Sequence, residues 1–395
     1  MILTAITTPY FWKGEADHIR RLLSEGKYAR VDIRKPYADS HSVERLIREI
    51  GQEFCPHLSL HSHFELARES GIGAIHLSRR NPHPPHGWKG ATGCSCHSVD
   101  ELKEMLPRVD YAYISPMFPS VSKPGYGTGS TLIDDIRLTQ LLHSPLGSKL
   151  VALGGVTPAR LPLLTEKGFT QAALLGSAMG VREFPIDSFR LQFITHGDTV
   201  GSLISQTHMA LDGGCRWVQL RAKHFSPEMI IAAGTEMSRM CHEVGAVMII
   251  DDHTNLVTAT GADGVHLGRN DMSVTEARDI LGPKYIIGAT ANTAAHIEEA
   301  YQAGADYIGL GPFRFTTTKS NLSPVLGEEG YRAITRHCHD RDIHIPIVAI
   351  GGITPDDIAG IIAAGADGIA VSGTIISSEN PVVTTRRLKQ LIDLN

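Results

Sequence analysis

The second half of the chain contains short apolar runs that alternate with longer stretches of helical periodicity. Most of these runs are apolar at nearly every position, which is the pattern of strands covered on both faces of a parallel sheet. We predict eight strands there, over residues 192–194, 217–221, 246–251, 264–267, 285–289, 307–310, 345–350 and 368–372. Eight strands alternating with helices in about 200 residues predict a compact (βα)8 barrel, and a doubly wound open sheet is the alternative.

Turn and capping residues mark the ends of the predicted helices. Ser226 and Thr354 are each followed by proline, which combines a helix N-cap with a proline at the first helical position. The tripeptide Gly-Ala-Asp begins at Gly261, Gly304 and Gly365, each time just before a predicted strand. Its glycine fits a helix C-terminus, and its aspartate leads into the strand that follows.

The same pattern of motifs occurs twice in the chain. The sequence VALGGVTP at residues 151–158 recurs as VAIGGITP at 348–355, and further motifs match in the same order. Such matches indicate a duplicated domain, with the join near residues 181–190. We therefore predict an α/β protein of two tandem (βα)8 TIM barrels, over residues 1–182 and 190–395, with shorter helices in the first copy.

Composition narrows the class of protein and its partners. The chain has 395 residues, 42% of them hydrophobic, which suffices for two domains with sizeable cores. Its 37 basic and 42 acidic residues form no basic patch, which argues against nucleic acid and membrane partners. The sequence lacks a signal peptide and any apolar run near the roughly 20 residues of a membrane span. Its six cysteines lack the spacing of a disulfide framework, so we expect a cytoplasmic enzyme with small-molecule substrates; homo-oligomer formation stays open.

Donor side chains follow the second predicted strand of the second copy. In a (βα)8 barrel the chemistry lies at the C-terminal ends of the strands. Gln219, Arg221 and Lys223 share one face there because strand side chains alternate. An amide, a guanidinium and an ammonium together suit a diphosphate. Basic residues at a solvated strand end are the alternative.

Carboxylates follow the next two strands. Asp251 and Asp252 end the third strand, and Asp271 follows the fourth. Neighbouring strand ends can bring Asp252 and Asp271 to one hard cation, and Mg²⁺ is usually held by one or two carboxylates together with substrate phosphates. Alternatively, Asp271 is the N-cap of the next helix.

Glycines and hydroxyl groups predict phosphate binding at the remaining strand ends. Gly352 follows the seventh strand, and Ser372 and Gly373 follow the eighth, where backbone N–H groups commonly hold a phosphate. Residues that suit a second phosphate lie after the fifth and sixth strands: Thr290, Thr316, Thr318 and Lys319.

The second copy resembles the thiamine phosphate synthase family from about residue 192 to residue 395. The matching motifs are QLRAK at 219–223, DD at 251–252, GVHLG at 264–268, GAT at 288–290, GLGP at 309–312, TTTK at 316–319 and IGGI at 350–353. The resemblance implies a barrel that joins hydroxymethylpyrimidine diphosphate to a thiazole phosphate, carboxylated or not, and releases pyrophosphate with the help of Mg²⁺.

The resemblance also implies roles for individual residues. The pyrimidine diphosphate and the departing pyrophosphate would contact Gln219, Arg221, Lys223 and Lys319. The thiazole phosphate would contact Thr316, Thr318, Gly352, Ser372 and Gly373. Asp252 and Asp271 would bind Mg²⁺. Thr290 stands where the family usually has Ser, and Asp251 replaces the usual Asn beside the pyrimidine.

The first copy keeps residues that suit a monophosphate but lacks the residues expected to bind Mg²⁺ and the diphosphate. Ser62 and Asn81 stand at the positions of Asp252 and Asp271, so we expect no Mg²⁺ site there. Asp32 replaces Gln219 and is expected to repel a diphosphate. The residues expected to hold a thiazole-type phosphate are Ser120, Ser122, Lys123 and Gly155.

The first copy also gains His97, in the stretch GCSCHS at residues 93–98. This stretch resembles the thiazole tautomerase branch of the same superfamily, in which a histidine after the fifth strand moves a proton to aromatise the thiazole. One alternative is a non-catalytic regulatory or scaffolding domain that binds a thiazole phosphate. Another makes the chain a different phosphate-binding barrel isomerase, which leaves Asp252 and Asp271 unexplained. A soft metal site among the clustered histidines and cysteines is a weaker hypothesis.

Overall fold

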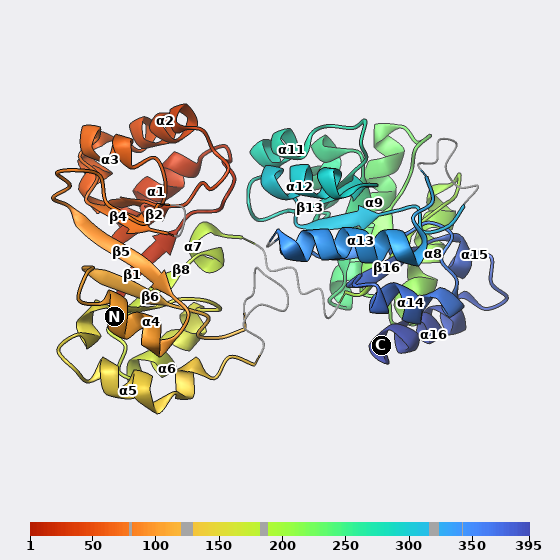
Figure 1. The fold of residues 1–395 in the computed structure, drawn as a ribbon. Coiled ribbons are helices and arrows are strands. Elements are labelled where there is room, and N and C mark those ends of the chain that lie inside the picture. Colours follow the sequence, from red (N-terminus) through yellow and green to blue (C-terminus); the bar gives the residue numbers. More distant parts are fainter. Residues whose placement is uncertain (79–80, 120–128, 182–188, 316–323, 342) are drawn as a thin grey trace. The chain divides into compact units, whose positions relative to one another are not determined.

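The computed structural model describes residues 1–78, 81–119, 129–181, 189–315, 324–341 and 343–395. The chain divides into two compact units, Met1–Glu183 and Phe184–Asn395 (Figure 1). In each unit eight parallel strands close into a barrel, and helices connect most successive strands; β4 and β5 of the first barrel follow one another without a helix among the described residues. The predicted α/β fold, two tandem (βα)8 TIM barrels, is therefore confirmed, and the open doubly wound sheet is excluded.

The first barrel runs from β1 to β8, and β8 pairs with β1 to close it. Its strands are β1 (Ile2–Ile6), β2 (Arg30–Ile33), β3 (Leu58–Leu60), β4 (Ala74–Leu77), β5 (Ala91–Cys96), β6 (Tyr111–Ile114), β7 (Leu150–Ala152) and β8 (Gln171–Leu174). Its helices are α1 (Glu15–Ser24), α2 (Ser40–Ile50), α3 (Phe64–Glu69), α4 (Val99–Met105), α5 (Ile136–Leu142), α6 (Leu161–Glu166) and α7 (Gly176–Met179).

The second barrel runs from β9 to β16, and β16 pairs with β9. Its strands are β9 (Leu191–Ile194), β10 (Trp217–Leu220), β11 (Val247–Asp251), β12 (Gly264–Leu267), β13 (Ile286–Ala291), β14 (Tyr307–Leu310), β15 (Ile347–Ile350) and β16 (Gly368–Val371). Its helices are α8 (Val200–Asp212), α9 (Pro227–Glu243), α10 (Val257–Thr260), α11 (Val274–Leu281), α12 (Ala294–Ala303), α13 (Gly327–Asp340), α14 (Ile358–Ala363), α15 (Gly373–Ile376) and α16 (Pro381–Asp393). The predicted strand bounds in this half agree with the structure to within two residues.

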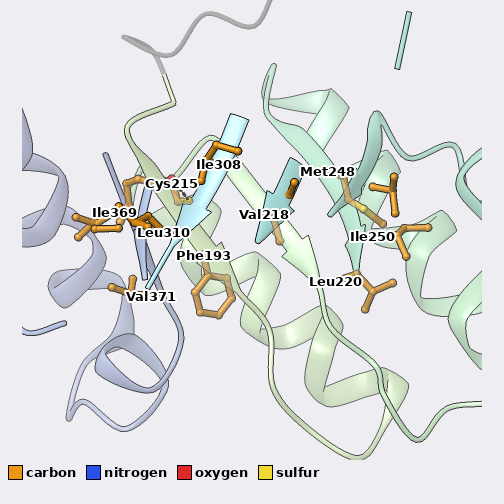
Figure 2. Packing of buried hydrophobic residues seen from close by; sticks show 14 of the residues in the cluster. Phe193, Cys215, Val218, Leu220, Met248, Ile250, Ile308, Leu310, Ile369 and Val371 are labelled. Carbon is orange, nitrogen blue, oxygen red and sulfur yellow. Dashed lines mark hydrogen bonds between the residues drawn. The ribbon is translucent and has the colours of Figure 1, made fainter. Parts of the chain in front are cut away.

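Two apolar layers explain why these strands are hydrophobic at every position. Side chains at alternate positions point outward and pack under the helices, as Figure 2 shows for Val218 and Leu220 of β10. Their neighbours, such as Trp217 of β10 and Tyr307 of β14, fill the barrel interior. Site residues continue the inward register, because Gln219 follows Trp217 by two positions.

Helix ends follow the predicted capping pattern. The Ser226 hydroxyl accepts the N–H of Met229 at the start of α9, and Thr354 forms a capping box with Asp357. Several helices of the first barrel are shorter than their counterparts: α1 has 10 residues against 13 in α8, and α2 has 11 against 17 in α9. The shorter helices predicted for the first copy are confirmed.

The Gly-Ala-Asp aspartates fasten the N-terminal ends of neighbouring strands. The glycines at 261, 304 and 365 have positive φ values of 70°, 94° and 94°, which suits a helix that ends in the left-handed region. Asp263, Asp306 and Asp367 each accept a backbone N–H of the preceding strand, from Met248, Ile287 and Ile347 at 2.8, 2.7 and 2.8 Å. This end of the barrel is therefore structural, and the chemistry is left to the opposite end.

The described residues also bear on the membrane and redox expectations. Each helix among them is too short or too polar to cross a bilayer. All six cysteines are free and buried, in agreement with the expectation that they form no disulfide framework. Cys94 and Cys96 lie on the outward face of β5 with their sulfurs 3.9 Å apart.

Candidate active sites at the two barrel mouths

A hydrogen-bonded row of amides and a carboxylate crosses the mouth of the second barrel. The Gln219 side-chain amide donates to Asp251 Oδ1 at 2.7 Å and accepts from the Gln192 amide at 3.0 Å. Gln219 is only 3% exposed, so its side chain lies at the floor of the mouth. It orients Asp251 while keeping one further N–H on the same amide nitrogen.

Arg221 and Lys223 rise from the same strand end. The Arg221 backbone N–H donates to the Thr195 hydroxyl at 3.1 Å, and its guanidinium donates to His196 Nδ1 at 3.3 Å. Arg221 Nε also lies 3.8 Å from Asp251 Oδ2, so the carboxylate holds the guanidinium side chain over the mouth. Lys223 is exposed at the rim. Both cations are placed to meet an anion that enters the mouth.

The structure brings Asp252 and Asp271 together. Burial, the charge of Asp251 and a hydrogen bond with the Asp271 carboxyl raise the pKa of Asp252 to about 7. Asp252 adopts a left-handed φ of 67°, which is unusual for a residue other than glycine. Asp271 accepts the Gly268 N–H at 2.7 Å, and the N-cap of α11 is Ser273. The alternative in which Asp271 caps that helix is therefore wrong.

This pair of carboxyl groups fits a hard divalent cation. Oxygen ligands suit Mg²⁺, and a cation between the two groups would offset the repulsion that raises the pKa of Asp252. Lys223 already lowers that pKa and thus faces the same carboxyl group. The residues present at this mouth therefore fit Mg²⁺ at Asp252 and Asp271.

A second polar chain supports the hydroxyl of Thr290. His266 Nε2 lies 3.0 Å from the Thr290 hydroxyl, and His266 Nδ1 lies 3.0 Å from the Tyr307 hydroxyl. Tyr307 packs on Gly288, where a Cβ atom would come within 2.1 Å of its ring. Thr290 is half-buried, so its hydroxyl stands between this network and the mouth.

Glycines shape the opposite side of the mouth. Gly351 and Gly352 have φ values of 101° and 65°, and a Cβ on Gly352 would approach the Phe315 carbonyl to 2.9 Å. The Arg314 N–H donates to the Gly351 carbonyl at 2.9 Å and ties the two loops together. Ser372 and Gly373 open the short helix α15, and among the described residues no side chain or backbone of another element lies within 4 Å of a Cβ built on Gly373. The backbone there is open to a ligand of phosphate size.

The mouth of the first barrel contains different hydrogen-bonded and charged pairs from those of the second barrel. Asp32 is fully buried, and its carboxylate accepts from Arg30 Nε at 2.8 Å, from His61 Nε2 at 2.9 Å and from the Tyr113 hydroxyl at 2.6 Å. Arg30 balances its charge. Asp32 is therefore an ion-paired carboxylate that faces the barrel interior, and the expectation that it repels a diphosphate stays a prediction.

The lysine that follows β2 in the first barrel, Lys35, is buried and its ammonium is fully hydrogen-bonded within the barrel. Lys35 follows β2 as Lys223 follows β10, yet Lys35 is 1% exposed. Its ammonium donates to Glu15 at 2.6 Å and to the carbonyls of Thr8 and Tyr10 at 3.0 and 2.6 Å. An ammonium has three N–H groups, so these acceptors use all of them. The lysine of the clamp is therefore buried here, whereas Arg34 keeps the place of Arg221: its backbone N–H donates to the Thr7 hydroxyl at 2.9 Å, as that of Arg221 donates to Thr195.

His97 has a defined tautomer. Its Nδ1 lies 3.0 Å from the Ser115 backbone carbonyl, which can only accept, so Nδ1 carries the proton and Nε2 carries the lone pair. Its backbone N–H donates to Glu101 at 2.6 Å, and Ser98 is the N-cap of α4. His97 is exposed, and the Ser115 carbonyl at the end of β6 orients its ring.

The glycine loop of the first barrel repeats that of the second. Gly154 and Gly155 have φ values of 88° and 62°, and the Phe118 N–H donates to the Gly154 carbonyl at 3.0 Å. Arg160 donates to the Gly155 carbonyl at 2.5 Å and its guanidinium lies 4.8 Å from the centre of the Phe118 ring. Its counterpart in the second barrel is Asp357, which is ion-paired with Arg314, so a guanidinium lies beside the glycines in both barrels but comes from different positions in the chain.

Comparison with known proteins assigns the chain to a family. A family model described as thiamine monophosphate synthase matches residues 3–178 and again residues 191–375. The chain belongs to the thiamine monophosphate synthase family. Both barrels are members of this family, as the duplication of motifs indicated.

Curated relatives of the thiamine monophosphate synthase family each match about half of this chain. Thiamine-phosphate synthase of Phocaeicola vulgatus is 53% identical over 201 residues, which are 51% of this chain and 97% of that protein. The enzyme of the same name from Bacteroides thetaiotaomicron is 49% identical over 198 residues, 50% of this chain and 95% of that protein. A solved structure, thiamine phosphate pyrophosphorylase from Pyrococcus furiosus, is 31% identical, covers 53% of this chain and 98% of its own, and has a TM-score of 0.47.

Several predicted site residues lie outside the described part of this family member. These are Thr316, Thr318 and Lys319 in the second barrel, and Ser120, Ser122 and Lys123 in the first. Conversely, sequence reasoning missed Gln192, His196 and Arg160. Each takes its position from a hydrogen bond to a different strand or loop, and no local motif signals such a partner.

Proposed function

We propose that the second barrel condenses hydroxymethylpyrimidine diphosphate with a thiazole phosphate, giving thiamine phosphate and pyrophosphate. The observation that carries the proposal is the meeting of Asp252 and Asp271 at one mouth with Arg221 and Lys223. Two converging carboxyl groups beside two cations suit a metal-bound diphosphate, and the glycine loop across the mouth suits a monophosphate. Another phosphate-binding barrel isomerase would leave the carboxyl pair without a role.

The condensation requires the protein to bind both substrates and to stabilise the charge that develops. It requires no protein nucleophile. The bond between the pyrimidine methylene carbon and the diphosphate oxygen breaks, and the thiazole nitrogen forms the new bond to that carbon. Arg221 and Lys223 stabilise the negative charge that develops on the leaving diphosphate, with Lys319, which lies outside the described residues, as a further cation. Bound at Asp252 and Asp271, Mg²⁺ would neutralise part of the same charge.

The remaining residues of the second barrel position the two substrates. Asp251 holds Arg221 through its Oδ2 and Gln219 through its Oδ1. Thr290 offers a hydroxyl held by His266. The thiazole phosphate would be bound by the residues across the mouth: Thr316, Thr318, Gly352, Ser372 and Gly373.

The test is the release of pyrophosphate by the full chain with both substrates and Mg²⁺. Asp252→Ala should lower kcat by about two to three orders of magnitude, the usual effect of losing a key electrostatic group. Asp279→Ala on the exposed face of α11 is the matched control and should leave the rate unchanged. Full activity of Asp252→Ala would refute the metal assignment, and a wild type that releases no pyrophosphate would refute the synthase proposal.

For the first barrel we propose a thiazole tautomerase. The observation that favours it is the orientation of His97, whose Nδ1–H donates to the Ser115 carbonyl, so that Nε2 is the nitrogen that would take a proton. Arg160 and the glycine loop beside it suit the phosphate of a thiazole. Here Ser120, Ser122, Lys123 and Gly155 would take part in binding that phosphate. A non-catalytic thiazole phosphate-binding domain is the alternative.

The rate at which the His97→Asn variant converts the thiazole tautomer decides between a tautomerase and a non-catalytic binding domain. The substitution should lower the conversion rate at least about a hundredfold, the usual contribution of a general base. If conversion by the wild type is equal to that by His97→Asn, the first barrel is a binding domain.

We further propose a cytoplasmic enzyme that acts on small molecules, without nucleic acid or membrane partners. Six free cysteines suit a reducing compartment.

A further inference from the structure

A group of titratable side chains in the first barrel has no part in the function proposed so far. Asp32 ends β2, His61 follows β3 and His76 lies on β4, so three neighbouring strands supply them. The ligand atoms of these residues all lie within 4.8 Å of one another. They lie at the end of the barrel that carries the chemistry.

The hydrogen bonds around Asp32 define the tautomer of His61. Burial alone would raise the pKa of Asp32, but Arg30 and the hydrogen bond from His61 together hold it below its ordinary value. The carboxylate is thus ionised and can only accept, so the proton of His61 lies on Nε2, 2.9 Å from Asp32 Oδ2. The lone pair of His61 then lies on Nδ1. The His61 side chain is 15% exposed, so the ring is accessible from the mouth.

His61 and His97 are linked along the same side of the mouth. The rings of His61 and His76 are stacked with their centres 4.2 Å apart, and His76 Nε2 lies 2.8 Å from the Ser95 hydroxyl. Ser95 and His97 are two positions apart at the end of β5, and both are exposed. Two imidazoles therefore border this mouth, and each has its tautomer set by an acceptor, Asp32 for His61 and the Ser115 carbonyl for His97.

A metal ion is a poorer explanation of the same residues. The His61 and His76 rings are within 8° of parallel, so their lone pairs lie in separate parallel planes and do not converge on one ion. The Arg30 guanidinium already neutralises Asp32. A fixed cation on the carboxylate and stacked imidazoles favour proton transfer over metal binding.

We propose that His61, oriented by Asp32, is a second proton-transfer residue of the first barrel and works together with His97 on a thiazole phosphate. One histidine removes a proton from a ring carbon, the electron pair shifts through the adjacent double bonds, and the other returns a proton to a second carbon. One C–H bond breaks and one forms, so the isomerisation needs no oxidant or further reactant. The inference rests on the tautomerase proposed above and adds a second base to it.

The first test compares His61→Gln with wild type in the full chain, by the rate of thiazole tautomer conversion. His61→Gln should lower kcat at least about a hundredfold while KM changes less than about threefold, because a proton-transfer group contributes to the reaction more than to binding. His57→Gln is the matched control. His57 is exposed just before the same strand, at the opposite end of the barrel, and should be silent.

The outcomes separate this inference from the function on which it rests. A wild type without conversion overturns the tautomerase and the inference with it. A wild type that converts, an inactive His97→Asn and a fully active His61→Gln overturn the role of His61 alone. Unchanged thiazole phosphate affinity and thermal midpoint in His61→Gln exclude a folding defect as the cause of lost activity.

A second measurement does not depend on activity or on any variant. Nitrogen NMR of the histidine side chains in the full chain should show the neutral ring of His61 with its proton on Nε2. The opposite tautomer would place the proton on the nitrogen that must act as base, and would overturn the inference even if the first barrel is a tautomerase.

Discussion

Replacing Asp252 with Asn should stabilise the second barrel in metal-free buffer, although it removes a residue of the proposed site. Burial, Asp251 and Asp271 raise the pKa of Asp252 from its ordinary 3.8 to about 7. Each unit of pKa corresponds to about 1.4 kcal/mol, which gives about 4 kcal/mol. The carboxyl group is partly exposed, so solvent screening reduces this by about half, to about 2 kcal/mol.

The raised pKa of Asp252 decides whether the free energy of unfolding rises or falls with pH. In the unfolded chain Asp252 ionises near pH 4, whereas in the folded chain its pKa is near 7. Between these values the folded chain binds more protons, so its free energy of unfolding falls as the pH rises, and the full loss is present at pH 8. An Asn side chain does not ionise and removes this loss.

Thermal unfolding of the full chain at pH 8 with a chelator measures the effect. About 2 kcal/mol corresponds to roughly 4–8 °C for a barrel of this size, in the transition that Mg²⁺ shifts in the wild type. Added Mg²⁺ should raise that midpoint in the wild type and much less in Asp252→Asn. Asp279→Asn, exposed on α11, should behave as wild type. A lower midpoint for Asp252→Asn in chelator, or an undiminished response to Mg²⁺, would refute the reasoning.

Further predictions concern stability. Asp32→Asn should destabilise the first barrel by about 3 kcal/mol in urea unfolding at pH 7, because it leaves Arg30, whose side chain is only 18% exposed, without its charge partner. Since the folded pKa of Asp32 is held below its unfolded value, the wild type should lose this contribution as the pH falls below about 4, and an acid-independent difference would contradict this. Gly288→Ala should cost about 1–3 kcal/mol, because the new Cβ would lie 2.1 Å from the Tyr307 ring; Gly201→Ala, in open space on α8, is its neutral control.

The strands and their order could be predicted because their environment is uniform. A strand in a closed parallel barrel touches helices on one face and other strands on the other, so apolar residues are required at every position. The second half shows this in β11, where Val247 faces the interior and Met248 faces the helices. The strand ends were equally predictable, and with them the positions of Arg221 and Asp252.

The partners of the charged residues could not be predicted in the same way. Lys35 and Lys223 follow equivalent strands, yet one is buried against Glu15 and the other is exposed at the rim. The difference lies in whether a carboxylate from α1 and two carbonyls of the preceding loop reach the ammonium. Asp32 likewise owes its partners to Arg30 on its own strand and to Tyr113 on β6, 81 residues away.

The sequence by itself therefore determined the duplication, the barrel class and the residues that end each strand. Local pattern suffices for these because burial on both faces and helix capping act over a few neighbouring residues. Only the tertiary structure decided that Asp252 and Asp271 share a hydrogen bond, that Asp32 is neutralised, and which nitrogen of His61 carries the proton. These properties depend on groups brought together by barrel closure, where the pKa and the tautomer respond to a neighbour within about 3 Å, whatever its distance along the chain.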